Sequence, residues 1–470
     1  MRALFSFILV CLSTACFSQK LIEFIGIQEE PIFKSKEDSV NYASLQSILS
    51  KSSIDSKDPR KFDSLFQLRM ILMSPDKITG FRKIYRANPN FFQYENLSNL
   101  TDFAQVKELS LSGKKYKKLP AEVFKCKNLE VLQLVNTSLS RLPRKINRQT
   151  SLKTVIVLNN KTNKPLKLKK NSHVETLVIR GEQPENLPLS YKNFTSLVKL
   201  DLSNNFLTKY PNGVNHNKKL KELILINNSI TLKDNDIKPN DYLEKLDLLK
   251  NEITKVPSSI ENLSNLRTLK FNYNSINEIA PEIGKLVKLE NLSLYNNQLA
   301  TIPDGVYQLK SLKQIDLYYN QIEKLDNDVM NWQNLEILYL AFNKVYTLSD
   351  KLGELKKLRE LYLHNNRLSS IPENLGNLEN LIVLRINNNR LLHLPPSLTK
   401  LTYLENLDIS RNEIQYLPIE FFDFRQLKIL GLVANPWDAE TKELLPEKVK
   451  ELRAKEIIVH LNSFDETVDN

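Results

Sequence analysis

The sequence predicts an α/β repeat solenoid, in which one short β-strand from each repeat stacks on the next to form a long parallel sheet. A skeleton of apolar residues, LxxLxLxxNxLxxLP, recurs along most of the 470-residue chain. Its first apolar position recurs fifteen times between Val106 and Leu427, at a constant step that is shorter by a single residue only from Leu152 to Val174. Self-similarity with a period of roughly 20–50 residues is typical of solenoids.

Within each repeat, the apolar residues indicate a strand and a returning segment. Counted from the first apolar residue, positions 1, 4 and 6 are apolar, an alternation typical of a strand. Positions 18 and 21, such as Ile260 and Leu263, are expected to close the core from the convex side. Cys126 holds position 21 of the first repeat, which predicts a buried apolar residue rather than a reactive thiol.

Position 9 is predicted to carry a structural ladder of asparagines, because an Asn side chain can bond to backbone groups that a turn leaves unpaired. The ladder comprises Asn205, Asn228, Asn251, Asn274, Asn297, Asn320, Asn343, Asn366, Asn389, Asn412 and Asn435. Lys114, Thr137 and Glu182 replace this asparagine in repeats 1, 2 and 4. Repeats 3, 4 and 6 are irregular, and we expect the regular body to begin near Leu197.

These repeats resemble those of leucine-rich repeat proteins, in particular the 23-residue class with Leu-Pro after the asparagine. The resemblance covers residues 106–437, which make up most of the chain. It implies a horseshoe with a parallel β-sheet on its concave side. Many members of this class are intracellular scaffolds.

The segment before the repeats is predicted to be helical. Residues 19–105 contain no repeat, and "NYASLQSILSK" and "KFDSLFQLRMILMS" have helical spacing. "SPDKITGFRKIYRANPNFF" suggests another helix before a turn. We expect an N-terminal cap or accessory segment.

The C-terminal residues 438–470 are predicted to form a cap and tail, because a solenoid needs polar ends. Trp437 is expected to cover the open core. Thr441 to Lys455 have the pattern of an amphipathic helix, with Pro446 as a candidate break.

Residues 1–18 have the pattern of a secretory signal peptide. A positive residue precedes an apolar core of about ten residues, which is too short to span a bilayer. Cleavage before Gln19 would give an exported protein that is secreted, periplasmic or held at the cell surface. An alternative is an N-terminal helix packed on the domain.

A lipid anchor at Cys16 is a further alternative, although Ser13 stands where a lipobox usually has an aliphatic residue. No other apolar run approaches the length that a membrane-spanning helix needs, so the sequence predicts no transmembrane span. The Lys- and Asn-rich composition and the short leader favour a bacterial source.

No motif indicates catalysis, a metal or a cofactor. The five histidines are scattered, and HExxH, CxxC, GxSxG, Walker and kinase motifs do not occur. We therefore expect no catalytic residue, no metal ligand and no cofactor. An enzyme remains an alternative that depends only on residues 19–100.

Aromatic residues gather at positions predicted to face the concave side of the sheet. Positions 2, 3, 5, 7 and 8 point away from the core, and repeats 8 to 13 place there Tyr273, Tyr295, Tyr318, Tyr319, Tyr339, Phe342, Tyr362, His364 and Arg385. These tyrosines could simply pack on each other in the sheet. We favour a partner-binding site, since Tyr and Arg are enriched at binding hot spots. A protein or peptide is the first candidate partner and a glycan the second.

Positive charge is concentrated near the start of the repeats. Residues 101–170 hold 17 Lys and Arg against 4 Asp and Glu, in a chain of net charge +12. The densest part comprises Lys114, Lys115, Lys117, Lys118, Lys164, Lys167, Lys169 and Lys170. The patch could be a solvated face, or it could contact an anionic glycan, lipid headgroups or an acidic partner. No nucleic acid is expected.

The sequence thus predicts a non-catalytic recognition module that acts outside the cytoplasm. The competing interpretation is an intracellular signalling scaffold.

Overall fold

The computed structural model describes residues 27–33, 78–85, 91–160 and 162–461. The chain divides into two units, Met1–Phe92 and Gln93–Asn470. The predicted signal peptide and two of the expected N-terminal helices, at 41–51 and 61–74, lie outside the described residues.

The first unit contains a two-stranded antiparallel sheet. Strand β1 (Ile27–Phe33) pairs with β2 (Ile78–Tyr85), with Ile27 opposite Tyr85. The helix expected over "SPDKITGFRKIYRANPNFF" is therefore wrong in its central part. Gly80 disfavours a helix there, and the neighbouring Ile and Thr residues are β-branched, which favours a strand. Because the helical preference is weak, pairing with a partner strand makes this segment a β-strand.

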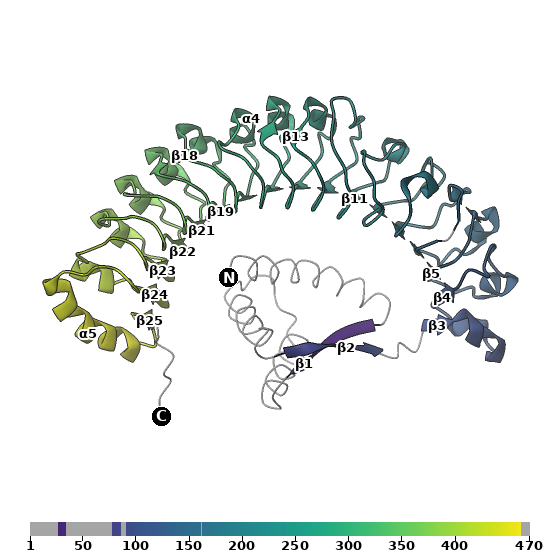
Figure 1. The fold of residues 1–470 in the computed structure, drawn as a ribbon, viewed down its shortest axis with the longest axis horizontal. Coiled ribbons are helices and arrows are strands. Elements are labelled where there is room, and N and C mark those ends of the chain that lie inside the picture. The colour runs from purple at the N-terminus through teal and green to yellow at the C-terminus, as the bar shows by residue number, and fades with distance from the viewer. Residues whose placement is uncertain (1–26, 34–77, 86–90, 161, 462–470) are drawn as a thin grey trace. The chain divides into compact units, whose positions relative to one another are not determined.

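The second unit is built on a long parallel sheet that lines the inner side of an arc (Figure 1). After β3 (Phe91–Gln93), its strands are β4 (Glu108–Ser112), β5 (Val131–Val135), β7 (Thr154–Leu158), β9 (Thr176–Arg180), β10 (Lys199–Asp201), β11 (Glu222–Ile224), β12 (Lys245–Asp247), β14 (Thr268–Lys270), β16 (Asn291–Ser293), β17 (Gln314–Asp316), β19 (Ile337–Tyr339), β21 (Glu360–Tyr362), β22 (Val383–Arg385), β23 (Asn406–Asp408), β24 (Ile429–Gly431) and β25 (Ile458–His460). Neighbouring strands pair one repeat apart, so Asp316 lies opposite Tyr339, and Tyr339 opposite Tyr362. Equivalent repeat positions therefore form rows along the sheet.

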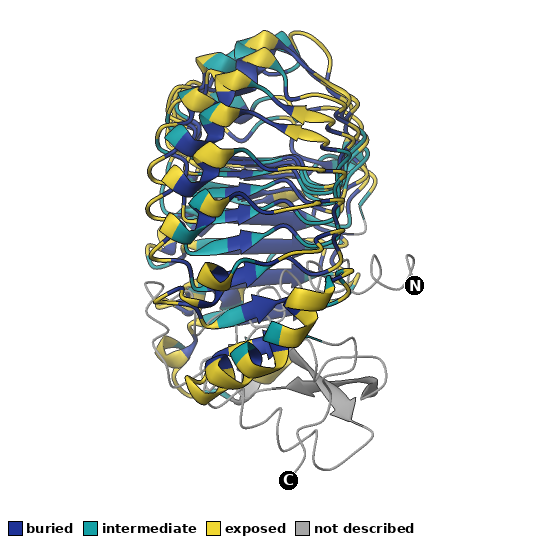
Figure 2. Cartoon of the chain, turned by 90° about the vertical axis from the view of Figure 1, so that its left-hand side faces the viewer, coloured by how far each residue is buried: buried dark blue, intermediate teal, exposed yellow. Residues whose placement is uncertain are grey.

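The outer side of the arc consists of short helical turns rather than long helices (Figure 1). They are 3₁₀ helices, at Tyr94–Asn99, Phe103–Gln105, Ala121–Lys125, Arg144–Arg148, Pro184–Asn186, Val214–His216, Ser258–Asn262, Pro281–Lys285, Asn327–Asn331, Asp350–Glu354, Glu373–Asn377, Pro396–Lys400 and Ile419–Phe422, and one α-helical turn, α4 (Asp304–Tyr307). Two-residue strands also occur in the returning segments: β6 (Arg141–Leu142), β8 (Lys167–Leu168), β13 (Lys255–Val256), β15 (Glu278–Ile279), β18 (Lys324–Leu325) and β20 (Thr347–Leu348). The outer turns carry many exposed residues, whereas the strands of the long sheet are mainly buried or half-buried (Figure 2).

The core lies between the sheet and the outer turns. In repeat 10, Leu312, Ile315 and Leu317 are fully buried. Trp332, at position 21, is also fully buried and stacks on Tyr307 with ring centroids 5.1 Å apart. Its indole Nε1 donates to a backbone carbonyl 3.1 Å away.

Cys126, at the same position in repeat 1, is buried, which confirms its assignment as a core residue. Desolvation raises the pKa of its thiol to about 11. The thiol therefore stays protonated at neutral pH and is a poor nucleophile.

The asparagine ladder joins each repeat to the one before it. Asn320 Nδ2 donates to the carbonyl oxygens of Leu294, 2.9 Å away in the preceding repeat, and of Leu317, 3.1 Å away in its own repeat. Its Oδ1 accepts from the backbone N–H of Leu299 at 3.1 Å. In repeat 4, the Glu182 carboxylate takes part of this role by accepting from the backbone N–H of Asn160.

The C-terminal cap consists of a helix and a final strand. Trp437 is buried, and α5 (Ala439–Ala454) begins after Asp438, whose carboxylate accepts from the backbone N–H of Thr441 at 2.8 Å. The helix continues through Pro446, so the candidate break does not occur. Strand β25 then pairs in parallel with β24 and extends the sheet.

Candidate functional site

The nine aromatic and polar residues predicted to face the concave side come together on six neighbouring strands, β14, β16, β17, β19, β21 and β22. Each of them is half-buried. We call this set the concave aromatic patch: Tyr273, Tyr295, Tyr318, Tyr319, Tyr339, Phe342, Tyr362, His364 and Arg385. The parallel register, with a step of one repeat, places these side chains in adjacent rows.

One row of ring contacts begins in repeat 8. The ring centroids of Tyr273 and Tyr295 are 5.1 Å apart, and those of Tyr295 and Tyr319 are 5.4 Å apart. Tyr319 stacks on Phe342 with a centroid distance of 4.3 Å and an angle of 12° between the rings. Phe342 in turn meets His364 edge-on at 5.4 Å.

A second group of rings surrounds Tyr318. Its centroid lies 5.3 Å from that of Tyr339 and 5.5 Å from that of His364. Tyr339 stacks on Tyr362 at 4.9 Å, and the Arg385 guanidinium lies 5.8 Å from the Tyr362 centroid. All nine side chains therefore belong to one continuous contact network.

The backbone at position 8 has a left-handed conformation in every repeat, with φ between 51° and 58° at the residues other than glycine. Asn or Gly, which tolerate this conformation, occupy position 8 at Gly113, Asn136, Asn159, Gly181, Asn204, Asn227, Asn296, Asn365 and Asn388. Tyr273, Tyr319 and Phe342 adopt the same φ, of 55°, 54° and 54°. A bulky residue there costs on the order of 1 kcal/mol. Lys250, Arg411 and Ala434 also have this conformation, and the three aromatic residues differ from them because their rings join one contact network.

The patch is close to neutral, because burial opposes charge at its centre. Burial, and then the positive charge of Arg385, lowers the pKa of His364 to about 4, so the imidazole is neutral at pH 7. Its Nδ1 atom is buried and has no hydrogen-bond partner within the described part of the chain. Burial also raises the pKa of the Tyr318 and Tyr362 phenols above the ordinary value. Such a surface suits a ligand with apolar and aromatic groups.

Asp316 lies at position 5 of repeat 10, and its role is structural. Its carboxylate accepts from the backbone N–H of Tyr318 at 3.2 Å and from the Ser293 hydroxyl at 2.9 Å. Burial raises its pKa to about 6. Asp201 and Asp408 accept from the backbone N–H two residues ahead in the same way. Sequence reasoning missed this use of position 5, although an aspartate recurs there as the last residue of the strand.

The eight lysines of the predicted basic patch are all exposed. Lys115 forms an ion pair with Glu95 at 3.4 Å, and its Nζ lies 5.0 Å from the centroid of the Tyr116 ring. The remaining seven have no ion pair among the residues described.

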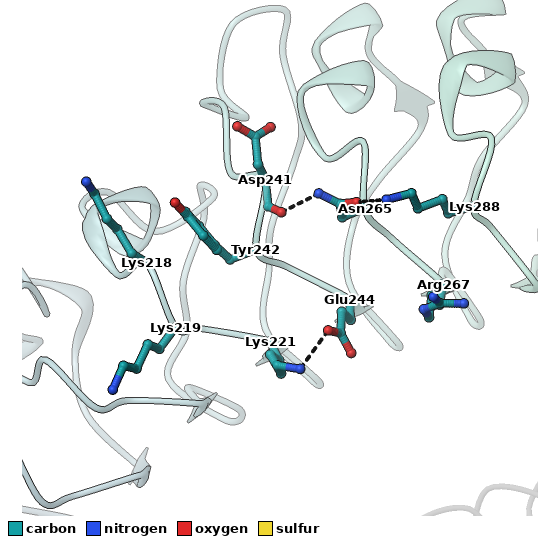
Figure 3. Close-up of a pocket in the computed structure, with 9 residues that line it drawn as sticks. All are labelled: Lys218, Lys219, Lys221, Asp241, Tyr242, Glu244, Asn265, Arg267 and Lys288. Atoms are coloured by element: carbon teal, nitrogen blue, oxygen red, sulfur yellow. Dashed lines mark hydrogen bonds and ion pairs between the residues drawn. The ribbon is translucent and has the colours of Figure 1, made fainter.

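A shallow pocket of about 380 Å³ opens over repeats 5 to 8 (Figure 3), and it was not expected from the sequence. Part of its charged lining is paired. Lys221 bonds to Glu244 at 2.8 Å, and Lys288 donates to the side-chain oxygen of Asn265. Lys218 and Lys219, which also line the pocket, have no ion pair among the residues described.

Over the same described ranges, no cluster of His, Cys, Asp and Glu could hold a metal ion. Nor does any described helix have the length and apolar character needed to cross a bilayer.

Comparison with known proteins identifies the repeats. A family model described as "Leucine-rich repeat region" matches residues 277–393, and one described as "Leucine rich repeat" matches residues 379–436. A comparison with curated proteins found no match.

Solved structures share the fold. A leucine-rich repeat protein of Leptospira interrogans is 25% identical with a TM-score of 0.50, and the match covers 78% of this chain and 99% of that one. The plant peptide hormone receptor RGFR1, in complex with RGF2, is also 25% identical with a TM-score of 0.50, over 71% of this chain and 60% of the receptor chain. Drosophila Toll, in complex with Spatzle, has a TM-score of 0.60 at 21% identity, over 72% of this chain and 52% of that chain. The chain thus spans about half to three-fifths of the Toll and RGFR1 chains.

Proposed function

We propose that this chain, which is a leucine-rich repeat protein, binds a protein or peptide partner through the concave aromatic patch. The observation that carries the proposal is the strained placement of Tyr273, Tyr319 and Phe342. These three rings occupy left-handed positions where most repeats have Asn or Gly, and they join a continuous half-buried network. A binding role would offset the conformational cost.

The dimensions of the patch suit an extended peptide. It crosses six strands, and five intervals of about 4.8 Å give a length of about 24 Å. An extended peptide of about seven residues has the same length. The RGFR1 structure, which contains a peptide hormone receptor in complex with RGF2, supports a peptide as the first class of ligand to test.

The proposed role is recognition without catalysis. The matching family models describe repeats rather than a catalytic domain, and the similar structures include receptors in complexes. An intracellular scaffold would use the same patch, so the cellular compartment must be tested separately.

The patch can be tested with a displayed library of random peptides and a Tyr319→Asn/Phe342→Asn variant. We expect peptides selected on the wild-type protein to bind the variant at least tenfold more weakly, a loss of about 1.4 kcal/mol or more. The variant should unfold at the same or a higher denaturant concentration, because Asn tolerates the left-handed backbone.

The matched control is Lys250→Asn/Arg411→Asn, which changes two exposed residues of the same position-8 row outside the patch. The control should keep wild-type affinity. Equal affinity of the selected peptides for the wild type and the patch variant would mean that the rings only pack the sheet. If no peptide were enriched, and the patch variant alone lost binding on a glycan array, the proposed partner would be a glycan rather than a peptide.

We also propose that the protein is exported, on the basis of the N-terminal sequence. Fractionation of expressing cells, followed by N-terminal sequencing, should recover a chain that starts at Gln19 outside the cytoplasm. A blocked Cys16 would instead identify a lipid-anchored protein. An intact Met1 in the cytosol would contradict export and leave the scaffold as the leading interpretation.

A further inference from the structure

Charges in the position-2 row alternate in sign along the sheet. The row contains Lys107, Glu130, Lys153, Glu175, Lys221, Glu244, Arg267, Glu290, Lys313, Glu336, Arg359, Glu405 and Lys428. Ion pairs join neighbours one repeat apart, at 2.8 Å for Lys221 and Glu244 and 2.9 Å for Lys313 and Glu290. Opposite charges on adjacent strands stabilise a sheet, and like charges destabilise it. Charges in this row are thus neutralised between repeats.

The position-13 row departs from this rule at its N-terminal end. Lys118 and Arg141 hold position 13 of repeats 1 and 2, Lys167 takes the equivalent place in repeat 3, and all three are exposed. Arg141 and Lys167 are direct cross-strand partners in β6 and β8. No ion pair connects any of the three to a carboxylate in the described ranges. Further along the same row, Lys255 and Glu278 form an ion pair at 2.8 Å.

We propose that Lys118, Arg141 and Lys167, here called the basic strip, bind an acidic polysaccharide. Three like charges on consecutive repeats repel each other, at a cost that the rest of the solenoid avoids. A bound polyanion would remove that cost. The strip uses none of the residues of the concave aromatic patch, so the two sites can be tested independently.

The geometry favours a linear polymer with one anionic group per sugar. The neighbouring strands β6 and β8 lie about 4.8 Å apart, so Arg141 and Lys167 repeat at about that interval, with Lys118 one repeat earlier. An extended acidic peptide presents side chains to one side only every second residue, about 6.8 Å apart. In a polymer whose sugar rings each carry a carboxylate or sulfate, neighbouring charges are separated by about the length of one ring. That separation matches the spacing of the cations better than the peptide does. Lys117, Lys169 and Lys170 are also exposed and add positive charge beside the strip.

The test measures binding of a size-defined heparin oligosaccharide to the full chain as a function of salt. The triple variant Lys118→Gln/Arg141→Gln/Lys167→Gln is expected to bind at least tenfold more weakly at physiological salt. The magnitude of its slope of log affinity against log salt should fall by roughly 2, because each of the three cations paired with a linear single-chain polyanion releases about 0.7 counterion.

The control removes the same number of charges elsewhere, as Lys218→Gln/Lys219→Gln/Lys238→Gln, all exposed lysines of repeats 5 and 6. Lys218 and Lys219 border the pocket of Figure 3. The control should keep near-wild-type affinity, and an equal loss in both variants would overturn the proposal in favour of non-specific attraction.

Two further probes separate the polyanion classes. Polyglutamate and phosphatidylserine vesicles should bind more weakly than heparin and depend less on the strip. Strip-dependent binding of either probe that is as tight as heparin binding would overturn the assignment to a polysaccharide. Folding is checked by thermal unfolding, in which the strip variant should be no less stable than the wild type because repulsion is removed.

Discussion

Replacement of Asn320 with alanine is expected to lower the free energy of unfolding by about 1–3 kcal/mol, the range for a buried polar group that loses its hydrogen-bond partner. The side chain is buried, and alanine would leave the backbone N–H of Leu299 without its acceptor. The carbonyl oxygen of Leu294 would lose one of its two amide donors and keep the other, from Asn297. Denaturant unfolding, followed by circular dichroism, measures the change.

Two variants make this result specific. Asn320→Asp keeps an acceptor for the Leu299 N–H but places a carboxylate oxygen against the carbonyl oxygens of Leu294 and Leu317, so at neutral pH it should be at least as destabilising as Asn320→Ala. Asn212→Ala changes an exposed asparagine outside the ladder and should stay within about 0.5 kcal/mol. If Asn320→Ala were no worse than Asn212→Ala, the ladder would not hold the repeats together.

Replacement of Trp332 with alanine is expected to cost about 3–5 kcal/mol, the range for a large buried aromatic residue. The indole is fully buried, stacks on Tyr307 and donates to the carbonyl oxygen of Val306. Its loss leaves a cavity behind the strands that carry the patch. Because repeats are stabilised mainly by their neighbours, amide hydrogen exchange should speed up most in repeats 9 to 11.

Trp332→Leu provides the matched comparison, since leucine is the usual residue at position 21. Trp332→Leu should lower the free energy of unfolding clearly less than Trp332→Ala does, because leucine keeps most of the apolar contact and loses only the ring and its N–H. Met330→Ala, at an exposed residue two positions away, should change stability by no more than about 0.5 kcal/mol. Similar losses for all three would mean that the indole is not packed as described.

The concave aromatic patch illustrates how far sequence reasoning reached. The repeat period assigns Tyr318 and Tyr339 to one face, because equivalent positions of a solenoid superimpose. The left-handed backbone at position 8 was missed, although its signal is present as Asn or Gly in nine of the fifteen repeats. Because of that backbone, placing an aromatic residue at Tyr319 or Phe342 costs conformational free energy that an ordinary sheet position would not.

The alternating charges at position 2 were also missed in the sequence. Lys221 and Glu244 come from successive repeats, and they can form an ion pair only because the strand register makes them neighbours. The same holds for Arg141 and Lys167, which lie further apart in the sequence than one repeat and become partners because β8 begins later within repeat 3 than β6 does within repeat 2. The sequence of the basic segment shows how much positive charge it carries, but not which of its side chains lie next to each other on the surface.

The sequence by itself determined the solenoid, its period and the face that each side chain takes, because periodic burial of leucines allows only one stacking of the repeats. It misjudged "SPDKITGFRKIYRANPNFF", where pairing with β1 outweighed the helical spacing. Only the tertiary structure decided the ring contacts, the neutral state of His364 and the unpaired cations of the basic strip. Each of these depends on distances and desolvation between residues far apart in the chain, which no local pattern records.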